Sequence, residues 1–593
     1  MTATNEPEKM MLKSLAAALM LAASTPALAA ASDDLKRVMD EQWAWFLKSN
    51  PVYATSLGTR TYDDRINDIS LAEADRQAAQ AKTFLDRLKA IPDAQLSPAE
   101  RTNKAILARL LNEQVEGNRY GQRQMLFTTY YGWHQGFAGM SEQLPFAKKA
   151  DYENYLKRLS QYPAYNQEAI RITRQAVAQG FTQPCEAMKG FEKTIIGVVT
   201  EDPSQSRFYA PFAGARPADA TEAEWAALQA RAKTLITLTL NPEYRRFHEF
   251  YTAEYAPKCR KTVGASAMPG GGDWYAFRAR SETTTNLTPE QIHQLGLKEV
   301  ARIRAEMETV ARQAGFATRE AFIQELRTNP KYYARTPEEL LAAAALQSKR
   351  IDGMLPKYFG RLPRLPYGVK AIPAEIAEGT TTAYAQTGSL ATGIASQYFV
   401  NTSKLDQRPL WELAALTPHE AAPGHLFQLG LQQELELPEF RKHQASFTAY
   451  VEGWALYTER LGIEMGLYDT PQKQMGRLSY EMWRASRLVV DTGLHAKGWT
   501  KAQAVAFMTD NTALSAANID AEVNRYISWP GQALGYKMGE LKIRELRTRA
   551  EQELGPKFDL RRFHDAVLGQ GAVPLDVLEM QIDSWIAGEK SKT

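Results

Sequence analysis

Two histidines and a glutamate lie within seven residues of an otherwise apolar part of this sequence. The segment reads His419-Glu420-Ala-Ala-Pro-Gly-His425. Imidazoles are common zinc ligands, and a glutamate beside the first one can take a proton from the water that zinc activates. The composition therefore predicts a zinc peptidase helix, with His419 and His425 as metal ligands and Glu420 as the general base.

The spacing of the histidines differs from the common motif, in which two ligands four residues apart share one helix face. Here they are six apart (425 − 419), and six residues rotate a side chain by about 240° on a straight helix. Pro423 cannot complete the helical hydrogen bonding and Gly424 tolerates unusual dihedrals, so we expect a kink or a two-residue bulge that returns His425 to His419. The alternative is a helix that ends at this Pro-Gly pair and carries two unrelated histidines.

A third ligand is expected on a helix over residues 449–460, which begins 24 residues after His425 (449 − 425). Glu452 and Glu459 are seven apart, so they lie two turns apart on one face. That face is otherwise apolar, and an unpaired buried carboxylate is costly. Zinc would neutralise Glu452, and Glu459 would hold an imidazole from the second sphere. The alternative is a pair of solvated glutamates.

The segment that follows contains candidates for the other parts of a peptidase site. Asp491 and His495 are four residues apart, so the carboxylate could orient the imidazole. The oxyanion that forms at a scissile carbonyl needs neutral or cationic donors, and a substrate carboxylate can pair with arginine. The candidate donors are His495, Tyr526 and Tyr536, and the candidate arginines are Arg487 and Arg525. Taken singly, each of these residues could equally serve in packing.

Strand signals gather just before the histidine segment. Residues 379–386 and 394–401 mix β-branched and aromatic residues between glycines, so we expect two strands. In zinc peptidases a strand beside the metal helix commonly holds an extended substrate by strand addition. Tyr398 is therefore a candidate substrate-binding residue, and a purely structural hairpin is the alternative.

The N-terminus has the features of a secretory signal. Residues 10–29 combine a basic residue, a short apolar run and small residues at Ala-x-Ala spacing. We expect cleavage after Ala29 or within two residues, no stable membrane anchor afterwards, and a periplasmic or secreted protein. The alternative is an uncleaved anchor.

Export makes the two cysteines informative. Cys185 and Cys259 are the only pair, and they enclose 74 residues (259 − 185). An oxidising compartment favours a disulfide between them, and two free buried thiols are the alternative.

The remaining sequence indicates a mainly α-helical protein. Apolar residues recur at steps of three and four from residue 33 to about 257, and Thr288 with Gln291 forms a capping box that begins another helix. We place a soft boundary near Lys261, which separates an N-terminal helical region (33–260) from a catalytic region (261–593). Residues 269–277 are expected to form a turn into a short strand. The net charge of +3 on 593 residues gives no indication of a nucleic-acid partner.

Four segments together resemble a known family. They begin at His419 (His-Glu-Ala-Ala-Pro-Gly-His), Val451 (Val-Glu-Gly-Trp-Ala-Leu-Tyr), Val489 (Val-Val-Asp-Thr-Gly-Leu-His-Ala-Lys-Gly-Trp) and Arg525 (Arg-Tyr-Ile-Ser-Trp-Pro-Gly-Gln-Ala). The sequence is similar to the bacterial family catalogued as domain of unknown function 885, over nearly the whole mature chain.

That family is similar in layout to helical zinc peptidases of the thimet oligopeptidase and angiotensin-converting enzyme kind, with a zincin-like fold. The resemblance implies that His419, His425 and Glu452 bind zinc, that Glu420 is the base, and that Glu459 lies in the second sphere. His495, Tyr526 and Tyr536 match the downstream donors in order only. The two-residue insertion between the histidines departs from the pattern.

These observations predict an exported zinc peptidase that acts on short peptides in a cleft between helical halves. Two alternatives remain at this stage. One is a metal-dependent amidase for a non-peptide or cell-wall amide, and the other is a non-catalytic periplasmic binding protein.

Overall fold

The structure, a computed structural model, describes residues 30–592 except residues 130, 374–376, 378–380 and 391–392. The predicted signal peptide and the first part of the predicted strand at 379–386 lie outside the described residues. Helices make up 70% of the structure and strands 4%. The predicted mainly α-helical class is therefore confirmed.

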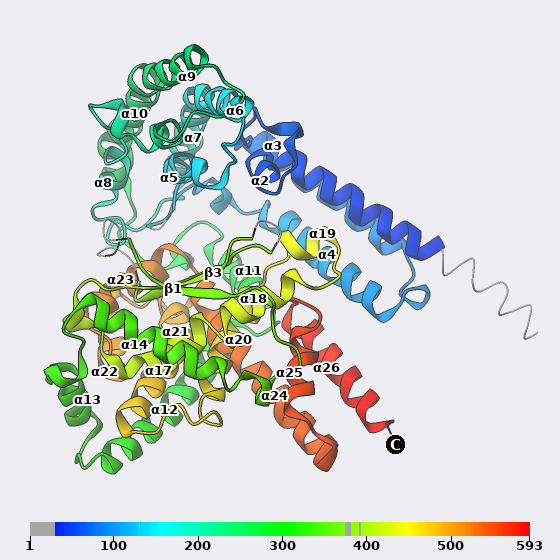
Figure 1. Cartoon of the computed structure of the whole chain (residues 1–593), viewed down its shortest axis with the longest axis vertical. Coiled ribbons are helices and arrows are strands. Elements are labelled where there is room, and N and C mark those ends of the chain that lie inside the picture. Colours follow the sequence, from blue (N-terminus) through cyan, green and yellow to red (C-terminus); the bar gives the residue numbers. More distant parts are fainter. Residues whose placement is uncertain (1–29, 130, 374–376, 378–380, 391–392, 593) are drawn as a thin grey trace, which may run out of the picture.

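One hydrophobic core belongs to a lobe of its own. Its buried residues all lie between 127 and 255, and they form the lobe at the top of Figure 1. Aromatic rings dominate this core, as between Trp133 and Phe247, whose ring centroids are 4.1 Å apart. The helices of the lobe are α5 (Trp133–Ala138), α6 (Lys149–Ser160), α7 (Tyr162–Ala178), α8 (Phe191–Ile196), α9 (Glu222–Leu235) and α10 (Asn241–Phe250).

A larger core joins the two ends of the chain. Buried residues from 31 to 111 pack against buried residues from 334 to 586. The core of the lobe ends at Tyr255, and the first helices of the chain pack with the main body. The other helices of this body are the one over residues 30–49, α3 (Leu71–Ala90), α4 (Pro98–Gly117), α13 (Arg319–Thr328), α14 (Pro337–Asp352), α15 (Leu355–Tyr358), α19 (Glu439–His443), α22 (Lys501–Asn511), α23 (Ala516–Ser528), α25 (Leu560–Leu568) and α26 (Leu575–Lys590). The short helix α2 (Pro51–Ser56) packs against the lobe through Val52.

Two pairs of long helices form the centre of the body. They are α12 (Pro289–Gln313) with α21 (Pro471–Ala496), and α20 (Thr448–Leu461) with α24 (Gly535–Leu554). Glycines allow the second pair to approach closely. A Cβ atom on Gly539 would lie 1.7 Å from the carbonyl oxygen of Ala449, and one on Gly453 would lie 2.5 Å from the Cα of Gly539. The helix that carries Glu452 is therefore fixed against α24.

A small sheet lies beside the centre of the body (Figure 1). Its order is β1-β3-β2, with β1 parallel and β2 antiparallel to β3. The strands are β1 (Tyr367–Ala371), β2 (Ala383–Gln386) and β3 (Ser396–Val400). β2 and β3 fall within the two predicted strands, whereas β1 joins them from a segment for which no separate strand was expected.

The glycine-rich segment at 269–277 does not lead into a strand. The structure has a turn followed by helix α11 (Gly271–Thr283). Gly270 has a φ of 62°, and a Cβ on Gly271 would lie 1.9 Å from the carbonyl oxygen of Ala265. The glycines are thus required by a left-handed turn and by a close backbone contact, and the prediction of a strand was wrong. The capping box of Thr288 and Gln291 is present at the start of α12.

Cys185 and Cys259 form a disulfide, the pairing that the sequence predicts. Next to it, Pro184 and Arg260 form an isolated parallel bridge. Two chain segments that border the lobe are therefore fastened to each other at one place.

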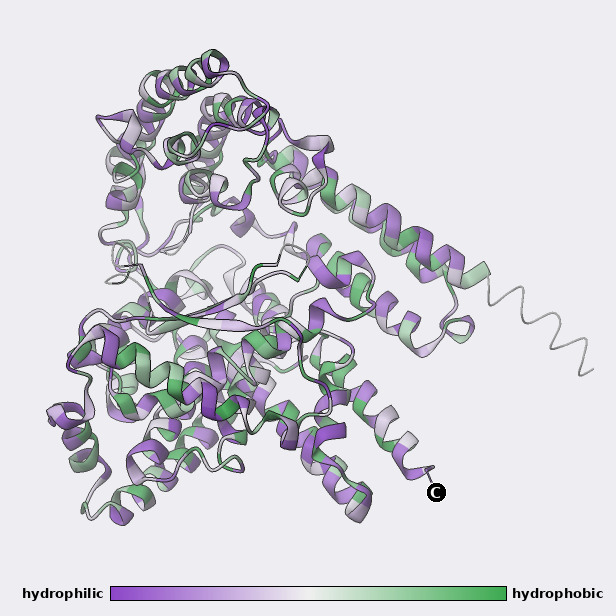
Figure 2. Cartoon of the chain, viewed as in Figure 1, coloured by the Kyte–Doolittle hydropathy of each residue, from purple (hydrophilic) through white to green (hydrophobic). Residues whose placement is uncertain are grey.

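Hydrophobic and hydrophilic residues alternate along the helices in Figure 2. Within the described part of the chain, every helix is too short or too polar to cross a membrane.

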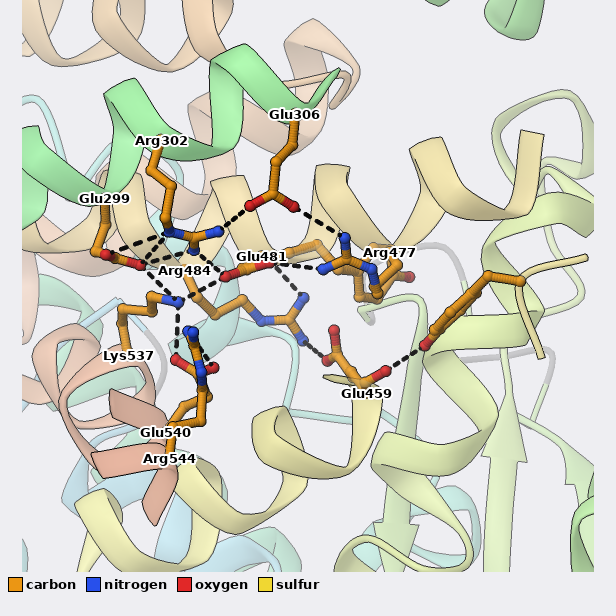
Figure 3. Close-up of polar contacts among 12 residues, drawn as sticks. Glu299, Arg302, Glu306, Glu459, Arg477, Glu481, Arg484, Lys537, Glu540 and Arg544 are labelled. Carbon is orange, nitrogen blue, oxygen red and sulfur yellow. Dashed lines mark hydrogen bonds and ion pairs between the residues drawn. The ribbon is translucent and has the colours of Figure 1, made fainter. Parts of the chain in front are cut away.

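A buried network of charges connects α12, α21 and α24 (Figure 3). Lys537, whose side chain is fully buried, lies 3.2 Å from Glu299, 2.9 Å from Glu481 and 2.8 Å from Glu540. Further members of the network are Arg302, Glu306, Arg477 and Arg544. Because buried charges are tolerated only when they are compensated, these contacts fix the relative position of the three helices.

Replacing Lys537 by methionine should leave three buried carboxylates without their shared cation. We expect the free energy of unfolding to fall by about 3–5 kcal/mol, as is typical when one partner of a buried ion pair is removed. Urea denaturation measures this change. Lys82→Met, at an exposed i, i+4 pair with Asp86, is the control and should cost less than about 1 kcal/mol. Equal losses for the two variants would contradict the importance of the network.

Candidate metal centre

The helix that was expected to carry both histidines is broken between them. Helix α17 (Leu413–Glu420) ends one residue after His419, and α18 (His425–Gln433) begins at the second histidine. In the connection, the peptide bond before Pro423 is cis, and Ala421 and Gly424 have ψ angles of −118° and −128°. The break brings the two imidazoles together, with ring centroids 4.8 Å apart and planes at 89°. The expected irregularity is thus a complete interruption of the helix.

The break depends on a glycine and on two side chains from α20. A Cβ on Gly424 would lie 1.9 Å from the carbonyl oxygen of His419, so no larger residue fits without movement. Trp454 donates a hydrogen bond to the carbonyl oxygen of Pro423 at 2.9 Å, and Thr458 donates one to that of Pro418 at 2.8 Å. These bonds satisfy carbonyl groups that the interrupted helix leaves without partners.

Glu452 meets both histidines from α20. Its Oε2 lies 3.3 Å from Nε2 of His425 and 3.7 Å from Nε2 of His419. All three residues can offer ligand atoms within 4.8 Å of one another. Ligands at about 2.0–2.1 Å from a tetrahedral zinc ion are separated by roughly 3.3 Å, so the spacing is suitable for one ion.

The electrostatics of the three residues favour a cation between them. Oε2 of Glu452 is buried and makes no hydrogen bond of good geometry with the described residues. Burial alone would raise the pKa of Glu452, but the two imidazoles hold it well below its usual range. Burial likewise opposes the charged form of His419, yet contacts with Glu452 and Glu459 raise its pKa to about 9. The donor set, two imidazoles and a carboxylate, fits zinc.

Glu459 contacts His419 at the ring nitrogen that does not face Glu452. Its Oε1 lies 2.8 Å from Nδ1 of His419, which leaves Nε2 facing Glu452. Nη2 of Arg484 lies 3.3 Å from the same oxygen, and both side chains are almost completely buried. The guanidinium of Arg484 is in turn 4.7 Å from the ring centres of Tyr480 and Trp483. A carboxylate that orients a ligating imidazole is a common outer partner of zinc sites.

Glu420 is the last residue of α17 and is partly exposed, next to His419. Its side chain is therefore the one of the His-Glu pair that keeps contact with solvent. Tyr398, in contrast, points into the core. Alternate residues of β3 are buried, and Tyr398 belongs to the buried set. The structure therefore does not present Tyr398 to a substrate, because strand alternation predicts two faces without saying which one is covered.

His495 is not available as an oxyanion donor. Its Nδ1 accepts a hydrogen bond from the backbone N–H of Ala265 at 3.0 Å, and its Nε2 lies 2.9 Å from the carbonyl oxygen of Tyr526, to which it donates. Burial lowers the pKa of His495 to about 3, so the ring stays neutral and has no further N–H. It also lies 11 residues beyond Arg484, about 16 Å along α21.

Asp491 does not orient His495. It accepts a hydrogen bond of 2.6 Å from the hydroxyl of Tyr275 and is reached by the backbone N–H of Gly531. Burial raises the pKa of Asp491 to about 7. The i, i+4 spacing that suggested a pair is overridden by these contacts with other elements.

Tyr526, Arg487 and Arg525 form one buried cluster around Glu522. The hydroxyl of Tyr526 donates to Glu522 at 2.7 Å, and each guanidinium lies 3.1 Å from the same carboxylate. Tyr526 also accepts a bond of 3.0 Å from Nε of Arg487. The polar groups of Tyr526 and the two arginines are therefore engaged with one another and with Glu522.

Tyr536 remains the downstream donor with the most suitable position. It is half-buried, and the guanidinium of Arg487 is 4.3 Å from its ring centre. It precedes Gly539 by three residues, and Gly539 contacts Gly453, the neighbour of Glu452. Tyr536 is thus the second residue of α24 and lies about one helical turn from the level of Glu452.

Trp454, Thr458 and Arg484 were not expected as site residues. Each acts on the centre across a contact between helices: Trp454 and Thr458 on the break, and Arg484 on Glu459. Spacing within one helix carries no signal for such contacts. The apolar stripe of α20 did contain Trp454, but a stripe of this kind indicates packing in general.

The comparisons with known proteins agree with the sequence resemblance. The family model described as bacterial protein of unknown function (DUF885) matches residues 51–582, and the chain belongs to this family. No curated protein matches the chain.

Two solved structures share the fold. A "putative lipoprotein" from Colwellia psychrerythraea is 27% identical with a TM-score of 0.85, over 94% of this chain and 99% of that chain. A second protein of that description, of unknown function and from Shewanella oneidensis, is 20% identical with a TM-score of 0.72, over 92% of this chain and 99% of that chain.

Replacing Gly424 by alanine should disturb the metal centre while leaving most of the helices intact. The added Cβ would push against the carbonyl oxygens of His419 and Pro418, so the two imidazoles should move apart. We expect zinc affinity to fall by at least about tenfold, since a changed ligand geometry acts directly on the metal. Competition with a fluorescent chelator measures it.

The matched control is Gly588→Ala, because a Cβ at Gly588 meets no atom within 4 Å. It should leave zinc affinity and the circular dichroism spectrum unchanged. Unaltered zinc affinity in the Gly424 variant would show that the break is not needed for the site.

Proposed function

We propose that this protein is an exported zinc-dependent peptidase that hydrolyses short peptides. The observation that carries the proposal is the convergence of His419, His425 and Glu452 within 4.8 Å, although the histidines are six residues apart. Packing alone does not explain this convergence. It requires a broken helix and a buried carboxylate, and both cost free energy. Glu420, beside the first ligand, supplies the base that hydrolysis needs.

Few residues take part in the proposed reaction. His419, His425 and Glu452 would hold zinc, which when bound supplies Lewis-acid chemistry at a water molecule and at the substrate carbonyl. Glu420 takes a proton from the attacking water and later gives it to the leaving amine. Glu459 keeps Nε2 of His419 directed at the ligand cluster. Tyr536 is the proposed donor to the oxyanion.

An extended peptide is the proposed substrate because of the sheet beside the centre. Helices α17 and α18 pack against β2, and α18 also packs against β3. β2 is an outer strand of the sheet, and an outer strand can take up an extended peptide through backbone hydrogen bonds. Export is proposed from residues 10–29 of the sequence, and the lipoprotein description of the Colwellia relative is consistent with it.

Two glutamine variants test the roles of the carboxylates. The purified protein should contain about one zinc ion per chain. Glu452→Gln should lose both the zinc and the activity, whereas Glu420→Gln should keep the zinc and lose activity by a factor on the order of 10²–10⁴. Elemental analysis gives the zinc content, and mass spectrometry of a digested mixed peptide library gives the activity.

Glu436→Gln, at an exposed glutamate of the same region, is the control and should match the unaltered protein in both measurements. Protein that holds no metal after purification and after zinc addition would refute the proposal. Zinc-containing protein that cleaves cell-wall amides but no peptide in the library would identify an amidase instead.

A further inference from the structure

A second candidate site lies at the junction of the lobe and the body. A cavity of about 250 Å³ is lined by residues from four parts of the chain, namely 117–128 with Tyr131, Gln183, 260–278 and 527–530. The hydroxyls of Thr129 and Ser528 are 2.7 Å apart and connect the two sides at this junction. Cavities where separate structural units meet are preferred places for small ligands.

Aromatic rings form much of its wall. Trp274, Phe277, Tyr131 and Trp529 all line the cavity. Tyr131 is 49% exposed and packs edge-on against Trp529, with ring centroids 5.8 Å apart. Both tryptophans are only partly buried. Half-covered aromatic rings that face a cavity provide a surface for the flat or apolar part of a ligand.

The charged residues of the wall are all arginines. Arg123 is paired with Asp75 at 2.5 Å, and Arg278 is paired with Glu282. Arg260 differs from them: Nε donates to the carbonyl oxygen of Thr182, and Nη1 to carbonyl oxygens of Thr262 and Gly264. Among the described residues no carboxylate pairs with Arg260, and its Nη2 makes no hydrogen bond.

Arg260 is thus a positioned cation that lacks a counter-ion. Burial lowers its pKa to about 10, which shows that its charge is poorly solvated yet still present at neutral pH. The backbone carbonyl groups fix the plane of the guanidinium. The remaining N–H groups therefore have a fixed orientation before any ligand binds. A carboxylate is the group that such a guanidinium binds best.

We propose that this cavity binds a carboxylate attached to an aromatic or large apolar group, with Arg260 on the carboxylate and the tryptophans on the ring. Two sources carry this chemistry, namely the C-terminal residue of a peptide and a small free aromatic acid. The proposal does not require the metal centre, because none of the lining residues belongs to it.

Calorimetry on the full-length protein tests the proposal with paired probes. N-acetylphenylalanine should bind, and N-acetylphenylalaninamide should bind on the order of tenfold more weakly, because it loses a charge-assisted hydrogen bond. A tripeptide that ends in phenylalanine and its amide form the second pair. Tighter binding of the tripeptide acid than of the acetylated amino acid would identify peptide C-termini as the source, and equal binding would identify small acids.

Variants assign the effect to residues. Arg260→Gln should abolish the difference between acid and amide, and Arg171→Gln, at an exposed pair with Glu168, should preserve it. Trp529→Leu should weaken both probes by roughly fivefold while keeping the difference. If Arg260→Gln does not fold, two measurements still test the proposal: the acid–amide comparison in the unaltered protein and the binding of both probes to the Trp529 variant. Equal affinities for acid and amide, or no binding of either, would overturn the proposal.

Discussion

The arrangement of this protein depends on the interruption of one helix between residues 420 and 425. A continuous helix would point the two imidazoles about 240° apart, whereas the interrupted one places their ring centroids 4.8 Å apart. The interruption removes helical partners from several carbonyl groups, and α20 replaces some of them through Trp454 and Thr458. The same helix contributes Glu452. Helix α20 therefore both brings Glu452 to the two histidines and provides hydrogen bonds to the broken backbone.

Charge compensation extends from this point through the body. Glu452 and Glu459 are both largely buried, and Arg484 is the only described cation that pairs with either of them apart from the histidines. The two carboxylates thus face two imidazoles and one arginine, and their negative charge raises the pKa of His419 to about 9. One helix further along, Lys537 neutralises Glu481 and Glu540 in the same manner but without any need for a ligand. Two sets of buried carboxylates thus lie on neighbouring helices, and the set at the candidate site has imidazoles among its partners, which can also bind a metal.

The sequence predicted what local patterns can encode. Helical periodicity and caps located several helices, among them α12 and α20, β-branched runs located β2 and β3, and residue chemistry selected His419, His425 and Glu452. The errors have a common origin in tertiary contacts. Gly270 forms a left-handed turn and Gly271 allows a close backbone contact. In the sequence alone, these glycines look like the start of a strand. Asp491 and His495 have ideal helical spacing, yet each is bound by a different distant element. Tyr398 lies on the covered face of its strand, which alternation alone cannot distinguish from the open one.

The large core has a consequence for the biogenesis of the chain. Its buried residues run from position 31 to position 586, with contributions from both ends. Such a core cannot close while the ribosome still holds the last helices, and loop-closure entropy makes contacts between distant segments slow to form. The nascent polypeptide should therefore stay incompletely folded for most of its synthesis. Under the export that we propose, this delay would keep the chain extended enough to pass through a secretion channel.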